Sequence, residues 1–420
     1  MIMSASKPST FHSFLSRLSY RAKRPRRAHR ITLIVGPLVL VSSLTSSACA
    51  ANQQQNFSVS STAGSTLDVA ALGEFDQPWA MSFLPSGELL VTEKGGNLWL
   101  VRPLSSAGNT SLSTVSPEQL ERVQVTGIPV TRASGQGGLG DVVVHPGYKN
   151  NRLIYLSYVE REDNLSGAAV VRAQLDLSDP DSPRLVARQD VWRQVPKVTG
   201  QGHYGHRMAF SSDGYLYITS GERQKFDPAQ DMQMNLGKLV RLFDDGSVPP
   251  DNPWASNGGI AAQFWSIGHR NPLGIAFADD GQLWVHEMGP RGGDELNRIV
   301  AGANYGYPLV SNGRHYSGLP IPDHDTRPDL QAPELSWSPV ISPSSIVIYE
   351  GDRYPGWQGT GLIGGLSSQA LVRVSLGESV TEIERFDMNR RIREVEQDSS
   401  GVVYLLEDKA GGRLLRLSMP

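Results

Sequence analysis

Cysteine is nearly absent from this chain of 420 residues, because its single copy, Cys49, lies close to the N-terminus. A mature domain that begins beyond this point has no internal disulfide, so a large core, helped by any metal it binds, must stabilise it. Charged residues are also scarce, at 19% of the chain. That scarcity, together with 43 Gly and 27 Pro, favours many short strands joined by turns over helical bundles.

The N-terminal region lacks both acidic residues and an apolar run long enough to span a bilayer. Its apolar run, Ile31 to Leu44, covers about 14 residues and follows eight Lys and Arg. Small residues at 48–50 come next, so we expect residues 1–50 to be a signal peptide for a periplasmic or secreted protein. Arg26-Arg27 also permits the twin-arginine route, and a lipobox-like segment ending at Cys49 permits a lipid anchor.

The chain also lacks positive charge once this leader is removed. Of its 39 Lys and Arg, 31 remain against 42 Asp and Glu, a net charge near −11. Such a body is a poor binder of nucleic acid and has no attraction to anionic lipid. We expect residues 51–70 to form a flexible linker and residues 71–420 to form one domain.

A recurring turn organises the rest of the chain. A dipeptide ending in Gly, followed by an apolar strand, occurs at Gly87, Gly214, Gly281 and Gly401, and looser versions begin near residues 150 and 356. Glycine supplies the positive φ of a tight hairpin, and an apolar strand precedes most copies. About six units at intervals of roughly 45 to 75 residues predict an all-β propeller with loop insertions. The alternative is a β-sandwich.

Two glycine-rich segments carry candidate functional side chains. Gln136 is displayed by a glycine run that has neither the Walker lysine nor the helix context of a dinucleotide-binding loop. His203 and His206 lie in a second such segment, where they could be a proton acceptor with its neighbour, a metal pair or ordinary turn residues. The metal interpretation is weak, since no third ligand stands at a recognised spacing.

Residues 265–308 combine charged side chains with glycines around short strands. Arg270 and Asn271 would be presented by a turn to one ligand. Gly289 and Pro290 leave two carbonyls outside a regular ladder, as a hard cation requires. Glu295, in an acidic turn, could also hold a cation or simply face solvent.

Arg391 and Arg393 alternate along an expected strand, so both guanidinium groups face the same side. Two such groups suit an anion with several carboxylates. A charged, solvent-exposed strand edge is the alternative.

Several motifs together resemble one family in the same order along most of the mature chain. They occupy residues 134–140, 145–158, 202–210, 268–274, 287–297 and 303–308. They are similar to the soluble glucose and aldose sugar dehydrogenases that use pyrroloquinoline quinone (PQQ). The resemblance implies an exported six-bladed β-propeller that holds PQQ and calcium and oxidises an aldose to its lactone by hydride transfer to the quinone.

The resemblance also implies roles for individual residues. His203 matches the general base, and Arg270 would stabilise charge on the quinone oxygen that it faces. Cofactor-binding residues would be Gln136, Arg270, Asn271, Arg391 and Arg393; calcium ligands would be the carbonyls of Gly289 and Pro290, with Glu295 and Tyr305 at a second, structural calcium.

Two departures from the family pattern stand out. An Asp commonly precedes the catalytic His, where this chain has Gly202, and His206 is a candidate replacement. A cofactor-binding Lys is expected near the fifth unit, where residues 365–369 offer only hydroxyls and an amide. A non-catalytic propeller that binds carbohydrate or protein is therefore the alternative function, and a calcium-dependent lactone hydrolase is a third. The substrate-selecting loops include the insertion at 315–333, and the sequence does not identify the sugar or the electron acceptor.

Overall fold

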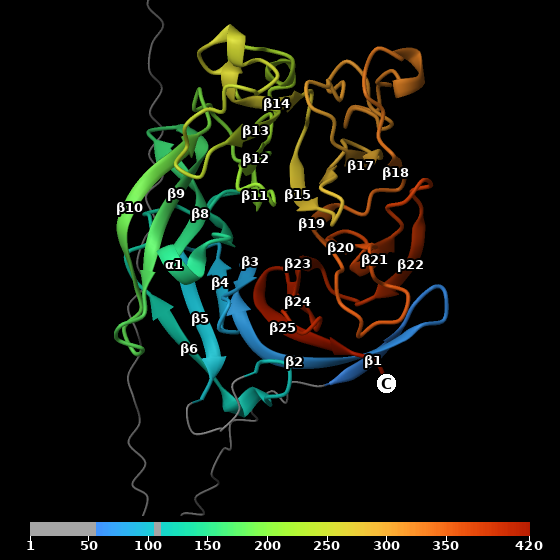
Figure 1. The fold of residues 1–420 in the computed structure, drawn as a ribbon. Helices are drawn as coiled ribbons and strands as arrows, with labels where there is room; N and C mark the ends of the chain where they lie inside the picture. Colours follow the sequence, from blue (N-terminus) through green and yellow to red (C-terminus); the bar gives the residue numbers. More distant parts are fainter. Residues whose placement is uncertain (1–55, 105–110) are drawn as a thin grey trace, which may run out of the picture. The chain divides into compact units, whose positions relative to one another are not determined.

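The computed structural model describes residues 56–104 and 111–420, so the expected leader and Cys49 lie outside the described residues. The described chain forms six antiparallel sheets whose innermost strands contact one another in a closed ring (Figure 1). The six-bladed β-propeller is therefore confirmed. No helix among the residues that are described is long and apolar enough to cross a membrane.

Each of the first five blades is a meander of four strands, counted outward from the axis. The first two blades are β3 (Pro78–Phe83), β4 (Leu89–Glu93), β5 (Asn97–Pro103), β6 (Leu120–Val125), then β7 (Leu139–Val144), β8 (Leu153–Glu162), β9 (Leu165–Asp176), β10 (Arg184–Arg193). The third and fourth are β11 (Gly205–Phe210), β12 (Leu216–Ser220), β13 (Lys238–Leu242), β14 (Phe264–Ile267), then β15 (Pro272–Phe277), β16 (Leu283–Glu287), β17 (Asp294–Arg298), β18 (Leu335–Trp337). The fifth is β19 (Pro343–Ile348), β20 (Gly361–Gly365), β21 (Ala370–Val374), β22 (Glu382–Asp387).

The sixth blade joins the two ends of the described chain. It consists of β23 (Ile392–Gln397), β24 (Val403–Glu407), β25 (Ala410–Ser418), β2 (Thr66–Asp76) and β1 (Phe57–Ser60), so β2 completes a sheet begun by the C-terminal strands. Its register pairs Val69 with Leu417. The expected linker over residues 51–70 is thus wrong from Phe57 onward, because these residues close the ring instead.

Among residues 56–104 and 111–420, helical structure is confined to short segments between strands. They are α1 (Tyr148–Asn151) and the 3-10 helices η2 (Pro117–Gln119), η3 (Asp227–Ala229), η4 (Ala255–Asn257), η5 (Ala261–Gln263) and η6 (His324–Thr326).

The recurring glycines make the turns that the sequence predicts. Gly87, Gly214, Gly281 and Gly401 have φ values of 96°, 88°, 83° and 79°, a region that residues with a side chain rarely adopt. Each N–H donates to a carbonyl three residues earlier, for example Gly87 to Leu84 at 2.8 Å. Each of these turns therefore joins the innermost strand of a blade to the second strand of the same blade.

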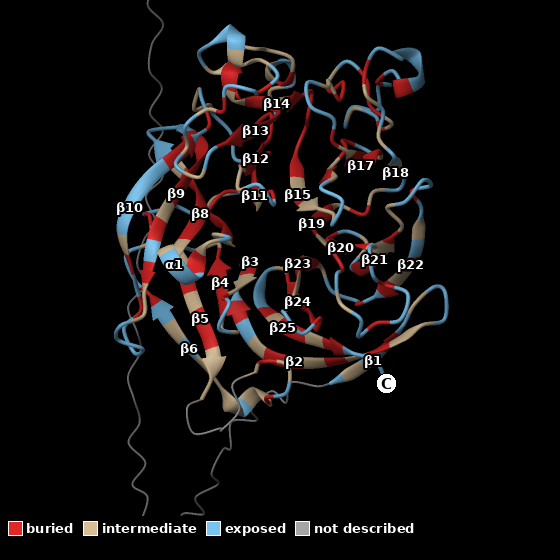
Figure 2. Cartoon of the chain, in the orientation of Figure 1, coloured by how far each residue is buried: buried red, intermediate tan, exposed pale blue. Residues whose placement is uncertain are grey.

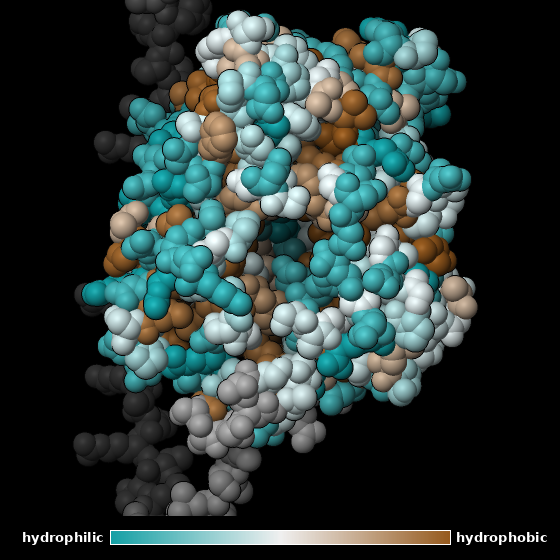
Figure 3. All heavy atoms as spheres, in the orientation of Figure 1, coloured by the Kyte–Doolittle hydropathy of each residue, from teal (hydrophilic) through white to brown (hydrophobic). Residues whose placement is uncertain are grey.

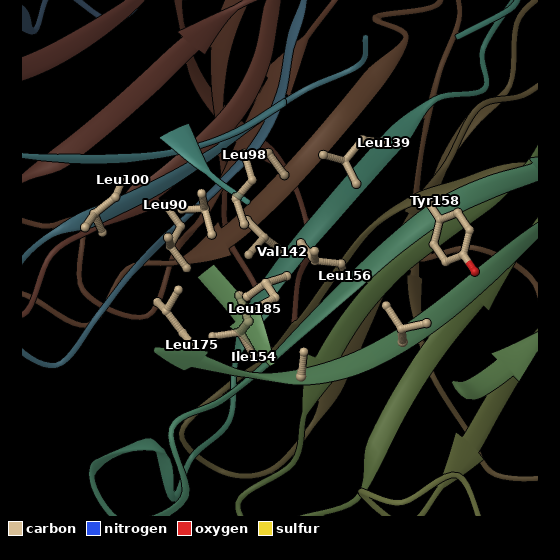
Figure 4. Packing of buried hydrophobic residues seen from close by; sticks show 14 of the residues in the cluster. Leu90, Leu98, Leu100, Leu139, Val142, Ile154, Leu156, Tyr158, Leu175 and Leu185 are labelled. Atoms are coloured by element: carbon tan, nitrogen blue, oxygen red, sulfur yellow. The ribbon is translucent and has the colours of Figure 1, made fainter. Parts of the chain in front are cut away.

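Apolar side chains from neighbouring blades fill the space between the sheets. Figure 4 shows one such layer, where Leu90 and Leu98 of the first blade meet Val142 and Leu156 of the second. Buried residues concentrate on the inner strands, while the outer strand β10 is largely exposed (Figure 2). This packing holds the inner strands rigidly and leaves their connecting loops to build a site.

Candidate active site

Three adjoining cavities lie against the loops that connect the blades, and Figure 3 shows the ring hollowed at its centre among hydrophilic side chains. The inner cavity, of about 330 Å³, is lined by Lys94, Gln136, Arg391, Arg393 and Asp408 among others. The central cavity, of about 780 Å³, shares Gln136 with it and adds His203, Arg270, Gly289 and Pro290. The outer cavity, of about 420 Å³, shares His203 and Arg270 with the central one and adds Glu222, Phe226 and Tyr316.

His203 is held at the point where the central and outer cavities meet. Its backbone is left-handed, with φ 50°, a strained conformation for a residue with a side chain. Its N–H donates to Gln136 Oε1 at 2.7 Å, and its carbonyl accepts from Arg223 N–H at 3.1 Å. Gly221 must lack a side chain here, since a Cβ on it would lie 2.2 Å from the His203 carbonyl oxygen. These contacts fix the direction of the imidazole.

Glu222 completes a histidine–carboxylate pair that the sequence analysis did not identify. Its carboxylate is hydrogen-bonded to His203 Nδ1, and its second oxygen accepts from the backbone N–H groups of Lys225 and Phe226, the latter at 2.7 Å. Its own N–H donates to the Arg270 carbonyl at 2.9 Å. Because Nδ1 donates its proton to Glu222, Nε2 is left as the proton acceptor.

The protonation states of this pair suit a general base. Burial is the largest influence on His203 and lowers its pKa; the hydrogen bond to Glu222 opposes that effect, and the charge of Arg270 adds to it. Burial raises the pKa of Glu222, but the hydrogen bond with His203 and further contacts outweigh it and leave that pKa lowered. Near neutral pH the pair is therefore an imidazole beside a carboxylate.

The first departure from the family pattern has a local explanation. A Cβ on Gly202 would lie 2.8 Å from the side-chain amide of Gln224, so that amide fills the space that an Asp side chain would need. His206 does not replace the missing Asp, because it is buried against Ser157 Oγ at 2.7 Å and stacks on Trp79. Burial lowers the pKa of His206 to about 3, so it stays neutral.

Arg270 lies across the central cavity from this pair. Its Nη1 donates to the carbonyls of Met288 and Gly289 at 2.8 and 2.7 Å, and its backbone N–H donates to the Glu287 carboxylate. Its Nη2 is 3.4 Å from the hydroxyl of Tyr316. Among the described residues, its buried Nε has no partner.

Asn271 is the second orphan of this turn. Its side chain is 1% exposed, and neither its amide nitrogen nor its amide oxygen finds a partner within the described part of the chain. An unsatisfied buried amide costs about 1–3 kcal/mol for each polar group. A ligand that hydrogen-bonds to the Asn271 amide would offset this cost.

Arg391 and Arg393 both reach the inner cavity, as the alternation predicts. They share one carboxylate: Arg391 Nε lies 2.7 Å from Asp408 Oδ2, and Arg393 Nη2 lies 2.9 Å from Oδ1. One carboxylate therefore faces two guanidinium groups, so the cluster of Arg391, Arg393 and Asp408 has a net positive charge. The alternative of an exposed strand edge does not fit residues that line a cavity.

Gly289 and Pro290 lie in the wall of the central cavity, beside Asp294. The Gly289 carbonyl already accepts one hydrogen bond from Arg270, and its N–H donates to Asp294 Oδ1 at 2.9 Å. Burial raises the pKa of Asp294 to about 6. A carbonyl oxygen has two lone pairs, so Gly289 can still offer one to a cation.

Glu295 and Tyr305, the residues expected at a second calcium, have different surroundings. Glu295 is buried beside Glu287 and Asn297, and burial together with the charge of Glu287 raises its pKa. The Tyr305 hydroxyl donates to the Arg298 carbonyl at 2.6 Å, and its own carbonyl lies 3.2 Å from His324 Nε2. In the described chain, no three Asp, Glu, His or Cys side chains are grouped to hold a metal ion.

The rim of the outer cavity is apolar and exposed. Phe226, Leu319 and Tyr316 are 45%, 65% and 72% exposed, and all three line this cavity. The Phe226 ring stacks 6.3 Å from that of Tyr307. Exposed aromatic rings gathered at one opening are typical of a binding surface, and residues 315–319 of the predicted insertion contribute to it.

The structure thus brings together Gln136, His203, Arg270, Gly289 and Pro290 around one cavity and Arg391 and Arg393 around the next. Sequence reasoning missed Glu222 and Lys94. The carboxylate of Glu222 lies 19 positions after His203, which no short motif reveals.

Comparison with known proteins places this chain in a family. Residues 75–416 match the model of the glucose/sorbosone dehydrogenase family. The aldose sugar dehydrogenase YliI of Escherichia coli is 38% identical over 367 residues, covering 85% of this chain and 94% of that protein.

Two solved structures have the same fold. The soluble aldose sugar dehydrogenase from Escherichia coli, in its apo-form, is 37% identical and covers 84% of this chain and all of its own, with a TM-score of 0.75. The PQQ-bound aldose sugar dehydrogenase of Streptomyces coelicolor is 26% identical, covering 84% and 98%, with a TM-score of 0.67. The chain therefore belongs to the glucose/sorbosone dehydrogenase family of oxidoreductases.

Proposed function

We propose that this protein is an exported PQQ-dependent aldose dehydrogenase, which oxidises the anomeric carbon of a sugar and releases the lactone. The observation that carries the proposal is the hydrogen-bonded pair of His203 and Glu222, which faces Arg270 across a cavity that opens into a cationic one. A general base, a cationic partner and an anion-binding chamber in series are what hydride transfer from a sugar to an anionic quinone requires.

The unpaired polar atoms of the site fit PQQ. The buried amide of Asn271 and Nε of Arg270 have no partner within the described residues. Arg270 lines the central cavity, Arg391 and Arg393 line the inner one, and Gln136 lines both. A planar ligand with carbonyl oxygens and several carboxylates would satisfy the amide and the guanidinium groups together. We therefore propose Gln136, Arg270, Asn271, Arg391 and Arg393 as the residues that hold it.

When bound, PQQ would supply an acceptor for the hydride that leaves C1 of the sugar. His203 Nε2 takes the proton of the C1 hydroxyl, so that the C–O double bond of the lactone forms as the hydride departs. Glu222 keeps Nδ1 protonated and stabilises the imidazolium that results, as a buried carboxylate does beside a catalytic histidine. The imidazole then returns its proton to solvent through the open outer cavity.

Arg270 contributes a fixed positive charge to the cavity that His203 also lines. Its guanidinium is fixed by the carbonyls of Met288 and Gly289, so it needs no reorganisation when negative charge develops near it. We propose that the apolar rim formed by Phe226, Leu319 and Tyr316 packs against the sugar. These residues orient the substrate, whereas His203 moves the proton.

We also propose that the carbonyls of Gly289 and Pro290 hold calcium in the central cavity, where Asp294 would balance part of its charge. The second calcium, at Glu295 and Tyr305, fits less well. The hydroxyl of Tyr305 is already bonded to Arg298, and its carbonyl faces His324, so we assign no role in the reaction to an ion there.

The test is whether the purified protein, loaded with PQQ and Ca²⁺, oxidises aldoses. Reduction of an artificial electron acceptor is measured for each sugar of a panel. We expect aldose-dependent reduction, which H203A abolishes while it still binds PQQ. Lys197→Gln, on the outside of the second blade near Glu160, serves as the unaffected control. Binding of PQQ without turnover of any aldose would refute the dehydrogenase, and failure to bind it would favour a non-catalytic propeller.

A further inference from the structure

Lys94 lines the inner cavity together with Arg391 and Arg393, but it comes from a different blade. Lys94 follows β4 in the first blade, whereas Arg391 and Arg393 belong to the sixth. The backbone of Lys94 is fixed at both ends: its N–H donates to the Gln77 carbonyl at 3.0 Å, and its carbonyl accepts from Leu139 at 3.1 Å. The side chain is therefore aimed from a rigid point.

The charges around this cavity are unbalanced. Lys94, Lys409, Arg391 and Arg393 line it, and the acid in its lining, Asp408, is already shared by the two arginines. The Lys94 ammonium donates to the carbonyl oxygen of Gly135 and not to a carboxylate. An anion with more than one carboxylate would balance the excess charge.

The surroundings of Lys94 also favour an anionic partner. Burial lowers its pKa first, and the nearby Arg393 lowers it further, while Asp408 raises it. An incoming carboxylate would oppose both effects, because it stabilises the charged form of the ammonium. Residues 365–369 of the fifth blade supply no positive charge, because they include no cationic side chain. The Ser367 hydroxyl is already bonded to the Val340 carbonyl at 3.1 Å and to Ser342 Oγ at 2.8 Å.

We propose that Lys94 binds a carboxylate of the cofactor together with Arg391 and Arg393, and so supplies from the first blade a cation that residues 365–369 do not provide. The proposal rests on the proposed function, since PQQ is the anion in question. It assigns Lys94 to binding of the cofactor and not to the chemistry at the sugar, because Lys94 lines neither the central nor the outer cavity.

A purely structural role is the competing explanation. The bond from Lys94 Nζ to the Gly135 carbonyl also holds the loop that presents Gln136, whose side chain in turn accepts from His203. Loss of Lys94 could therefore loosen the loop instead of removing a charge. The two roles differ in their dependence on the charge of the ligand.

The experiment measures the dissociation constant for PQQ by absorbance titration of the purified protein, for wild type, Lys94→Gln, Lys94→Arg and the exterior control Lys197→Gln. Each protein is also titrated with the trimethyl ester of PQQ, which has no carboxylate charge, and circular dichroism verifies its fold. We expect Lys94→Gln to bind PQQ about 10- to 100-fold more weakly, because a hydrogen bond to a charged group is lost. Lys94→Arg should stay within about threefold of wild type, and both variants should bind the ester as wild type does.

The outcomes separate the two proposals. If wild type binds PQQ and Lys94→Gln binds it equally well, Lys94 is not a cofactor ligand, although the proposed function stands. Equal weakening of PQQ and ester binding in Lys94→Gln would also overturn the inference, in favour of loop support. If wild type binds neither, the proposed function itself fails.

Discussion

Substitution of Glu222 by Gln tests the pair of His203 and Glu222 most sharply. It replaces one carboxylate oxygen by an NH₂ group, and both oxygens have hydrogen-bond partners in the wild type. In the wild type, one carboxylate oxygen faces His203 Nδ1, and the other accepts from the N–H groups of Lys225 and Phe226. An amide has only one oxygen. If that oxygen stays with the two backbone donors, the NH₂ group faces Nδ1 and moves the histidine proton to Nε2, where it blocks the base.

The magnitude follows from the cost of the alternative amide orientation. Turning the oxygen toward His203 would confront two backbone N–H donors with an NH₂ group, at about 1–3 kcal/mol for each unsatisfied donor. The reactive tautomer is then populated at roughly one part in 30 to one part in 10⁴. We expect the rate of sugar oxidation in Glu222→Gln to fall by a similar factor.

Single-turnover kinetics provide the assay, with PQQ-loaded protein mixed with excess aldose and the absorbance of the quinone followed over time. Affinity for PQQ should be unchanged, since Glu222 lines the outer cavity and not the inner one. Glu160→Gln, which alters a carboxylate paired with Arg193 on the exterior, is the matched control. A Glu222→Gln rate within about threefold of wild type would show that His203 is not held by this carboxylate during catalysis.

Three further expectations follow from the same site. The base His203 has a pKa lowered mainly by burial, so kcat/KM should stay level down to about pH 6.5, the ordinary value for imidazole, and fall only below it as His203 protonates; a decline that begins well above pH 7 would contradict this. Asn271→Leu should stabilise the cofactor-free protein by about 1–2 kcal/mol in denaturant unfolding, since it removes two unpaired buried atoms, while PQQ affinity falls; stability lost together with unchanged affinity would count against a ligand role. Chelation of Ca²⁺ should weaken PQQ binding reversibly if the Gly289 and Pro290 carbonyls hold the ion, and equal affinity with and without Ca²⁺ in a titration would remove calcium from the account.

The blade architecture could be predicted from the sequence because its signal is local. A Gly turn such as that at Gly281 joins neighbouring strands, so a window of a dozen residues contains both halves of the hairpin. Strand β2 carries no such signal: its partner β25 lies more than 300 residues away, and the alternation in residues 66–76 is interrupted by register shifts. A pairing between the two ends of a chain is set by ring closure and not by local propensity.

The site shows the same division. Gln136, His203 and Arg270 stand in glycine-rich or turn motifs and could be named from residue types and spacing. Glu222 was missed because its role depends on the left-handed backbone of His203 and on the turn at 222–226, where Arg223 and Phe226 also have positive φ values of 62° and 64°. Lys94 was missed because Arg391 and Arg393, which line the inner cavity with it, come from the sixth blade, and only the closed ring brings that blade near the first.

Titration of PQQ into the calcium-loaded protein, followed by a single addition of an aldose, tests the central claim most directly. We predict saturation at one PQQ per chain, a shift in the absorbance of the bound quinone, and its full reduction when the sugar is added. Absence of a saturable absorbance change, or bound PQQ that no aldose reduces, would contradict the assignment of these cavities to a quinone-dependent sugar dehydrogenase.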